Sequence, residues 1–256
     1  MTAAAVNHAA VKFGKLPARH DARTLMLARY LGVLPAIPAA CDWGKAAHAP
    51  WGMMANDVVG DCTCAAAGHA TQAWTANHGT EVTIPDAAIL AAYSAITGYT
   101  PSDPNSDQGA VELDVLKFWR STGIGGRKIG AFAALEPKNK GHIRAALDLF
   151  GGLYIGLALP LSAQGQKVWS VPCAGTHGKG APGSWGGHAV AVVAYDAAGL
   201  TCITWGALQK MTWRFWETYT DESYAILSPD WVAPGKVAPS GLDLAALQAD
   251  LAFVTG

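Results

Sequence analysis

Charged residues are scarce in this sequence, and the two signs are balanced. Lys and Arg number 18 and Asp and Glu number 19 among 256 residues, which gives a formal net charge of −1. No run of basic residues occurs anywhere along the chain. Proteins that bind nucleic acid or an anionic membrane surface carry concentrated positive charge. The composition therefore argues against both kinds of partner.

Long apolar runs are also lacking, although 51% of the residues are hydrophobic. The longest run, LFGGLYIGLALPL at 149–161, is too short and too rich in glycine to span a bilayer. Residues 1–23 contain no apolar core of the length that a signal peptide needs. We therefore expect a globular protein of the cytoplasm.

The sequence has no second cysteine pair that would complete a zinc site. Cys62 and Cys64 are separated by one residue, whereas zinc ligands normally come as two pairs with wider spacing. The five cysteines are odd in number, and a chain of this length forms a core without crosslinks. We expect free thiols, no metal ion and no cofactor.

Helical patterns come first along the chain and strand patterns follow. This segregation predicts an α+β fold with two lobes. The expected domains are an N-terminal lead-in over 1–36, a helical lobe over 37–150 and a β-rich lobe over 151–256. The predicted helices cover 22–32, 62–78, 85–99, 111–123, 140–152 and 240–253, and the predicted strands cover 153–160, 188–196, 200–206 and 223–229.

The stretch NDVVGDCTCAAAGHA, residues 56–70, contains the strongest candidate for a nucleophile. Asp61 is suited to the N-cap of the helix that starts at Cys62. The positive end of a helix dipole favours a thiolate in the first turn. The alternative is that both cysteines only pack the core. Because a helix separates Cys62 and Cys64 by about 200°, only one of them can face a site.

A nucleophilic cysteine needs a basic partner, and His188 is the histidine best placed for that role. It opens the strand HAVAVVAYD directly after the glycine-rich turn SWGG, whereas the other seven histidines lie in irregular segments, at helix ends or far down a helix. The alternative is an ordinary surface or packing residue at a strand start.

Several segments resemble those of the papain-like cysteine proteases, in the same order along the chain. IPAACDWGKAAHAPWGMMANDVVGDC, residues 37–62, is similar to the start of the mature enzymes, and HAVAVVAYD is similar to their histidine strand. CITWG at 202–206 is similar to their Asn-Ser-Trp-Gly stretch. The resemblance covers about 37–228. It implies a two-lobed papain-like fold, in which a helical lobe precedes an antiparallel, barrel-like β lobe.

The resemblance also implies the roles of individual residues. Cys62 would be the nucleophile and His188 its base, and Asn56 would be the oxyanion donor because it precedes Cys62 by six residues, where the family has glutamine. Thr204 follows His188 by sixteen residues and would orient the imidazole, while Trp205 would shield the pair from water. The residues expected to line the substrate site beside them are Gly60, Asp61 and Gly187.

The implied activity is that of a thiol-dependent peptidase or amidase, which cleaves amide bonds of a peptide or protein through an acyl-enzyme. Three differences from the family's residues argue against full activity: Asn56 is one methylene shorter than glutamine, Thr63 replaces a tryptophan, and Thr204 replaces an asparagine. The alternative is a weak or inactive papain-fold protein with a structural or binding role. The chain is similar to compact chains of phages and bacteria. The non-catalytic protein could therefore be a virion component or a phage protein in the host cytoplasm. A third possible function is the cleavage of cell-wall peptide cross-links.

The lead-in over residues 1–36 is shorter than a typical inhibitory pro-segment of this family.

Overall fold

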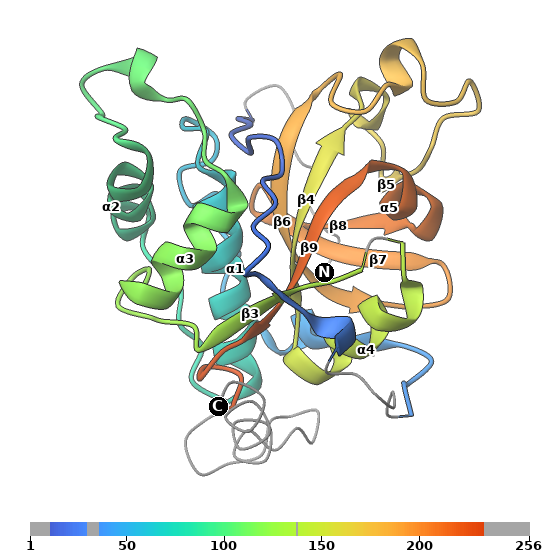
Figure 1. Ribbon diagram of the computed structural model, residues 1–256, viewed down its shortest axis with the longest axis horizontal. Coiled ribbons are helices and arrows are strands. Elements are labelled where there is room, and N and C mark those ends of the chain that lie inside the picture. The colour runs from blue at the N-terminus through green and yellow to red at the C-terminus, as the bar shows by residue number, and fades with distance from the viewer. Residues whose placement is uncertain (1–10, 30–35, 137, 233–256) are drawn as a thin grey trace.

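The computed structural model describes residues 11–29, 36–136 and 138–232. Helices and strands form a mixed α+β fold, as the sequence predicts. In Figure 1 the longest helix, α1, stands with α2 and α3 beside one large sheet. The helices are α1 (Cys62–Asn77), α2 (Asp86–Thr97), α3 (Glu112–Ser121), α4 (Lys140–Phe150) and α5 (Trp213–Tyr219). The 3-10 helices are η2 (Leu27–Arg29), η3 (Trp43–Ala46), η4 (Pro104–Ser106), η5 (Leu161–Ala163) and η6 (Gly178–Gly180).

The sheet has nine strands in the order β1-β3-β9-β4-β6-β7-β8-β5, and β2 pairs with β6 beside this path. Strands β4 and β6 lie at its centre and are buried along nearly all of their length, which explains their continuous apolar sequence. Most pairings are antiparallel, while β1 with β3 and β5 with β8 are parallel. The strands are β1 (Leu25–Met26), β2 (Cys41–Asp42), β3 (Ala131–Ala134), β4 (Leu153–Leu159), β5 (Val168–Trp169), β6 (Gly186–Tyr195), β7 (Gly199–Thr204), β8 (Ala207–Thr212) and β9 (Thr220–Leu227).

Helix α1 packs directly on the centre of the sheet, and this contact brings the two halves of the chain together. Its sequence is rich in alanine, and its residues are buried from Cys62 to Thr75. Tyr154 in β4 donates a hydrogen bond to the carbonyl of Thr63 (2.9 Å), and Trp74 donates one to the carbonyl of Phe150 (3.1 Å). These bonds fix the first and last turns of the helix. At its N-terminus the backbone amide of Ala189 in β6 lies against the Cys62 side chain.

Most of the predicted elements are present, with one error and one segment outside the described residues. The expected helix at 22–32 is wrong over its described part, where β1 and η2 occur instead. The leucines there pack as an edge strand, with Leu25 paired to Ala133 of β3. The helix expected at 240–253 lies outside the described residues. Strands β3 and β8 and helix α5 were not predicted, because their short mixed sequences carry no clear period.

None of the helices in the described part of the chain is both long and apolar enough to cross a membrane. Over the same residues, no three His, Cys, Asp or Glu side chains are grouped so that they could hold a metal ion.

Candidate active site

Cys62 is the first residue of α1, and the preceding loop sets its position. The carbonyl of Asp61 accepts the amide hydrogens of Cys64 (2.8 Å) and Ala65 (3.0 Å), which starts the helix at this point. The thiol is buried, with 1% of the residue exposed. Its polar neighbours are the backbone amides of Ala189 in β6 and of Gly14 near the N-terminus, and both favour the thiolate.

His188 comes from β6, and two residues of the next strand hold its ring. Nε2 lies 2.6 Å from Oγ1 of Thr204, the last residue of β7. Trp205 stacks on the imidazole, with 4.3 Å between ring centroids and 20° between the planes. The main chain of Trp205 has a φ of 45°, which turns the indole back over the histidine. Nδ1 is buried and has no hydrogen-bond partner among the described residues. It is therefore the ring nitrogen available for another group.

Burial favours the neutral forms of Cys62 and His188, whereas the sequence predicts a thiolate and an imidazolium. The start of a helix was expected to lower the thiol pKa, but burial raises the pKa of Cys62 to about 12. Burial also lowers the pKa of His188 to about 3. Desolvation disfavours the charged form of each group by more than the helix dipole and the backbone amides stabilise it. In this arrangement the thiol and the imidazole are both neutral at pH 7.

Asn56 and Asp61 belong to the loop before α1 but differ from their expected arrangement. The side-chain amide of Asn56 donates to the carbonyl of Val59 (3.1 Å) and lies beside the Asp61 carboxyl, whose charged form it favours. Asp61 occupies the N-cap position, yet its side chain makes no cap hydrogen bond, and among the described residues neither carboxyl oxygen has a hydrogen-bond partner that meets the usual geometry. The carboxyl is buried instead, and burial raises its pKa to about 8.

Asp107 holds this loop in place, and sequence reasoning missed it. One carboxylate oxygen accepts the amide hydrogen of Gly60 (2.9 Å), and the other accepts the hydroxyl of Tyr93 in α2 (2.7 Å). The Tyr93 oxygen in turn accepts the amide hydrogen of Gly109 (2.8 Å). The turn-rich sequence TPSDPNSDQG at 100–109 indicated a loop, but nothing in it indicated the contact with Gly60.

Residues 11–16 lie across the site, and we call them the covering segment. In Figure 1 the chain here runs between the helices and the strands. The amides of Lys12 and Lys15 donate to the carbonyls of Asn56 (3.1 Å) and Gly187 (3.2 Å). Gly14 accepts from the amide of Ala110 (2.7 Å), whose own carbonyl accepts from Leu16 (2.9 Å). The segment therefore joins the loops on both sides of Cys62 and separates the thiol from solvent.

Glycines allow this close approach. A Cβ on Gly14 would lie 1.6 Å from the carbonyl oxygen of Gly60, and one on Gly187 would lie 2.2 Å from the carbonyl oxygen of Lys15. A Cβ on Gly109 would lie 2.3 Å from the carbonyl oxygen of Gly14. A side chain at these positions would displace the covering segment, so Gly60 and Gly187 face this segment in the described arrangement.

Phe13 fixes the covering segment against the aromatic side of the site. Its ring meets Trp185, Trp205 and His188 edge to face, with centroids 5.1, 5.7 and 5.8 Å away. The indole of Trp205 also donates to the carbonyl of Lys12 (3.4 Å). Trp205 thus contacts both the histidine ring and the covering segment.

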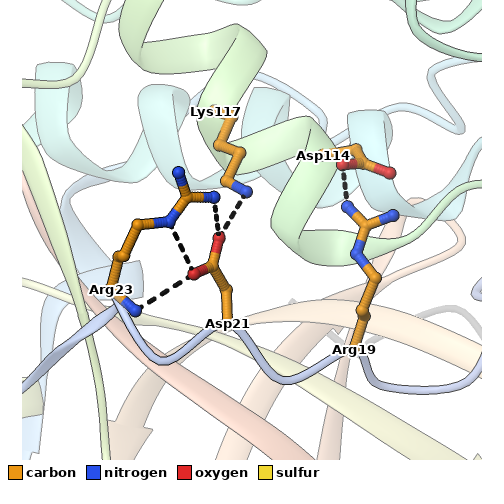
Figure 2. A network of polar contacts seen from close by, with 5 residues as sticks. All are labelled: Arg19, Asp21, Arg23, Asp114 and Lys117. Atoms are coloured by element: carbon orange, nitrogen blue, oxygen red, sulfur yellow. Dashed lines mark hydrogen bonds and ion pairs between the residues drawn. The ribbon is translucent and has the colours of Figure 1, made fainter.

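Salt bridges continue the attachment beyond the covering segment. Figure 2 shows that Arg19 pairs with Asp114 of α3, and that Asp21 accepts from both Arg23 and Lys117. The distance between Lys117 Nζ and Asp21 Oδ2 is 2.8 Å.

A cavity of about 370 Å³ lies between residues 18–20, Lys138 and the start of β9. Neither Cys62 nor His188 lines that cavity.

Helix α1 contains a second cysteine and a histidine, and both are core residues. All five cysteines are free thiols, and Cys64 is fully buried in the core of α1, where its charged form is strongly disfavoured. His69 lies two turns down the same helix and bonds the carbonyl of Gly52 (3.1 Å). Burial lowers the pKa of His69 to about 4, so it is a neutral core residue.

No family model matches the sequence, and no curated protein matches it. Solved structures do match. Xylellain, a cysteine protease from Xylella fastidiosa, aligns over 86% of this chain and 97% of its own, with 15% identity and a TM-score of 0.64. The cysteine protease and lectin-like domains of Cwp84 from Clostridium difficile align over 87% and 57%, with 10% identity and a TM-score of 0.59.

A Carica candamarcensis cysteine protease aligns over 75% of this chain and 99% of its own, with 15% identity and a TM-score of 0.53. Identities this low compare the course of the backbone rather than the chemistry of the site. The chain has the fold of the papain-like cysteine proteases.

Proposed function

We propose that the protein is a thiol-dependent peptidase that uses Cys62 and His188. One observation carries the proposal: Thr204 and Trp205 hold the His188 ring while Nδ1 has no hydrogen-bond partner among the described residues, and the backbone amide of the next residue, Ala189, lies against the Cys62 thiol. The large majority of buried side-chain nitrogens have a hydrogen-bond partner, so the free Nδ1 calls for an explanation. The papain-like fold also supports a thiol peptidase, because the solved structures with this fold are cysteine proteases.

The proposed reaction follows from which nitrogen is free. With Nε2–H donating to Thr204, Nδ1 accepts the Cys62 proton, and the thiolate attacks the carbonyl carbon of an amide. The imidazolium then protonates the leaving amine as the C–N bond breaks. Water attacks the acyl-enzyme, giving its proton to Nδ1, and the S–C bond breaks to release the acid and restore the thiol. Thr204 positions the ring, and Trp205 excludes water from it.

Two groups are proposed to stabilise the oxyanion. The amide N–H of Cys62 is the first of α1 and has no partner within the helix. The Asn56 side chain is the second donor, and it would need to exchange Val59 for the oxyanion. Donors of this kind act on the charge that develops in the transition state.

The described arrangement is a closed state of the proposed enzyme, because the covering segment occupies the space in front of the thiol. Its departure would admit water, which would lower the pKa of Cys62 and raise that of His188. The thiolate–imidazolium pair is therefore proposed for the open state only.

The test uses Gly14→Ala, whose new Cβ clashes with the backbone of Gly60 and so displaces the covering segment. Iodoacetamide should modify Cys62 in this variant at least ten-fold faster than in the wild type, as mass spectrometry of the intact protein and its peptides would show. The variant should hydrolyse peptides from a mixed library, and adding Cys62→Ala should abolish the hydrolysis.

Cys64→Ala is the matched control, since Cys64 belongs to the same turn but points into the core. It should leave both rates unchanged in the Gly14→Ala background. Hydrolysis that survives Cys62→Ala, or no hydrolysis once Cys62 reacts rapidly, would contradict the proposal.

The second candidate is a non-catalytic protein that binds a partner in a larger assembly, such as a virion. The observation that favours it is the weak third member of the site, a threonine hydroxyl in place of an amide. Rapid alkylation of Cys62 in Gly14→Ala without any hydrolysis would favour this candidate.

A further inference from the structure

Three carboxyl groups surround the ammonium group of Lys15, the residue that follows the thiol's neighbour Gly14. Lys15 Nζ lies 2.9 Å from Asp221 Oδ2 and 2.8 Å from Glu222 Oε1, both at the start of β9. Glu112, the first residue of α3, is the third acid and acts on Lys15 through its charge. The Lys15 side chain is 1% exposed. We call the group of Glu112, Asp221 and Glu222 the lysine site.

Gly156 in β4 creates the space for this side chain. A Cβ there would lie 1.9 Å from Cε of Lys15, 2.7 Å from the Asp221 carboxylate and 2.9 Å from the Glu112 carboxylate. The absence of one side chain from the central strand therefore leaves room for an unbranched chain and its charged end. The backbone of Lys15 lies beside His188, because the Lys15 amide donates to the carbonyl of Gly187 (3.2 Å).

The lysine site places three carboxyl groups around one ammonium group. Burial and the charge of Glu222 raise the pKa of Glu112 well above its ordinary value, which favours the protonated form of this acid. Glu112 is fully buried, and neither of its oxygens accepts a hydrogen bond among the described residues. Glu222 is also nearly buried, with 7% of its side chain exposed. Buried carboxyl groups without a cationic partner are strongly destabilising. Any group that replaces Lys15 here is therefore favoured if it brings a positive charge.

The geometry suits a single ammonium group. Lys15 Nζ donates hydrogen bonds to Asp221 Oδ2 (2.9 Å) and to the carbonyl of Leu16 (3.1 Å), and it forms an ion pair with Glu222 (2.8 Å). A lysine ammonium is a compact charge that can serve several single acceptors, whereas the planar fork of arginine is suited to one bidentate partner.

We propose that the lysine site is the specificity site of the enzyme, and that it binds a lysine side chain of the substrate within one or two residues of the bond that is cleaved. This inference rests on the proposed function, since it concerns the same thiol. In the described state the covering segment fills the site with the chain's own lysine.

The binding test uses the full chain with Gly14→Ala and Cys62→Ala, which opens the site and prevents turnover. Isothermal titration compares the peptide acetyl-Phe-Gly-Lys-Leu-amide with its norleucine counterpart, which keeps the methylene chain without the charge. The lysine peptide should bind at least ten-fold more tightly. Adding Glu222→Gln should reduce the difference to less than three-fold. Asp86→Asn, at an exposed carboxyl at the start of α2, is the control and should leave it unchanged.

A second background protects the test if Gly14→Ala fails to fold. Lys15→Met with Cys62→Ala removes the occupant of the site and leaves the glycines intact. Stabilisation of this variant against heat by the lysine peptide, and not by the norleucine peptide, is the expected result. Equal binding of the two peptides in either background overturns the inference.

The two proposals can fail separately. Hydrolysis by Gly14→Ala that depends on Cys62 but shows no preference for lysine among library peptides would overturn the specificity and leave the peptidase. Preferential binding of the lysine peptide with no hydrolysis would overturn the peptidase and leave a lysine-binding site.

Discussion

At the scale of the residue, Thr204 shows how a single oxygen orients an imidazole. A hydroxyl both donates and accepts, so it can bond Nε2 in either tautomer, whereas an amide oxygen accepts only. Two other features limit the orientation and the protonation state of the ring: the stack with Trp205 fixes the ring plane, and burial keeps the imidazole neutral. The ring is thus held by packing as much as by its hydrogen bond.

Asp61 provides a prediction for the dependence of stability on pH. Its folded pKa, about 8, lies above the ordinary value of 3.8, so the native state keeps a proton that the unfolded chain loses. The contribution of this group is therefore favourable at low pH and is lost as pH rises from about 4 to about 8. Asp61→Asn should remove that loss. The variant should match the wild type near pH 4 and exceed it above pH 8, by a few kcal/mol at most.

Urea unfolding at pH 4, 6 and 8.5 would measure this difference. Asp57→Asn is the matched control, because Asp57 lies in the same loop and is less buried. Its difference from the wild type should not change with pH, and a constant difference for Asp61→Asn would contradict the prediction.

At the scale of the element, the covering segment has no regular secondary structure but makes some of the most specific contacts in the protein. Its residues, VKFGKL, show neither a helical nor a strand period. Only the residues opposite, such as Gly60, Gly109 and Gly187, explain its course. Those contacts join residues far apart along the chain, and a single sequence does not show them.

Phe13 carries the apolar part of this attachment, and Phe13→Ala should weaken it. The lost contacts with Trp185, Trp205 and His188 should let the covering segment open more often. Iodoacetamide should then modify Cys62 at least five-fold faster than in the wild type. Lys12→Ala serves as the control, because Lys12 bonds through its backbone and its side chain is exposed. Equal rates for the two variants would show that Phe13 does not hold the segment.

The longer elements could be predicted from the sequence, and the chemistry of the site only partly. Helix α1 and strand β6 have clear composition signals and end within two residues of the predicted bounds. The order of Cys62, His188 and Trp205 pointed to the papain-like fold. The neutral state of the thiol could not be predicted, because it depends on burial by a segment more than 40 residues earlier in the chain.

At the scale of the whole molecule, Trp231 connects α1, α4 and the segment before α1. Its indole donates to the carbonyl of Leu149 (2.7 Å), and its ring meets Trp43 edge to face at 4.9 Å. The backbone carbonyl of Trp231 is bonded by His78 at the end of α1. A Cβ on Gly151 would lie 2.4 Å from this ring, so the turn after α4 fits closely against it.

Trp231→Ala should therefore destabilise the whole protein, by about 3–5 kcal/mol for a fully buried aromatic ring. Chemical unfolding followed by both tryptophan fluorescence and far-UV circular dichroism measures the change. Val58→Ala, at a residue that is 64% exposed, is the control and should stay within about 0.5 kcal/mol of the wild type. A loss of less than about 1 kcal/mol for Trp231→Ala would show that the ring contributes little.

The ion pair between Lys15 and Asp221 spans 206 residues of sequence and has a consequence for the order of folding. Contacts of such separation cost the most loop-closure entropy, and they form after local structure. On the ribosome Lys15 emerges first, but Asp221 emerges only when almost the whole chain has been made. Local contacts within the helices and hairpins are therefore expected to form before this ion pair closes over the site.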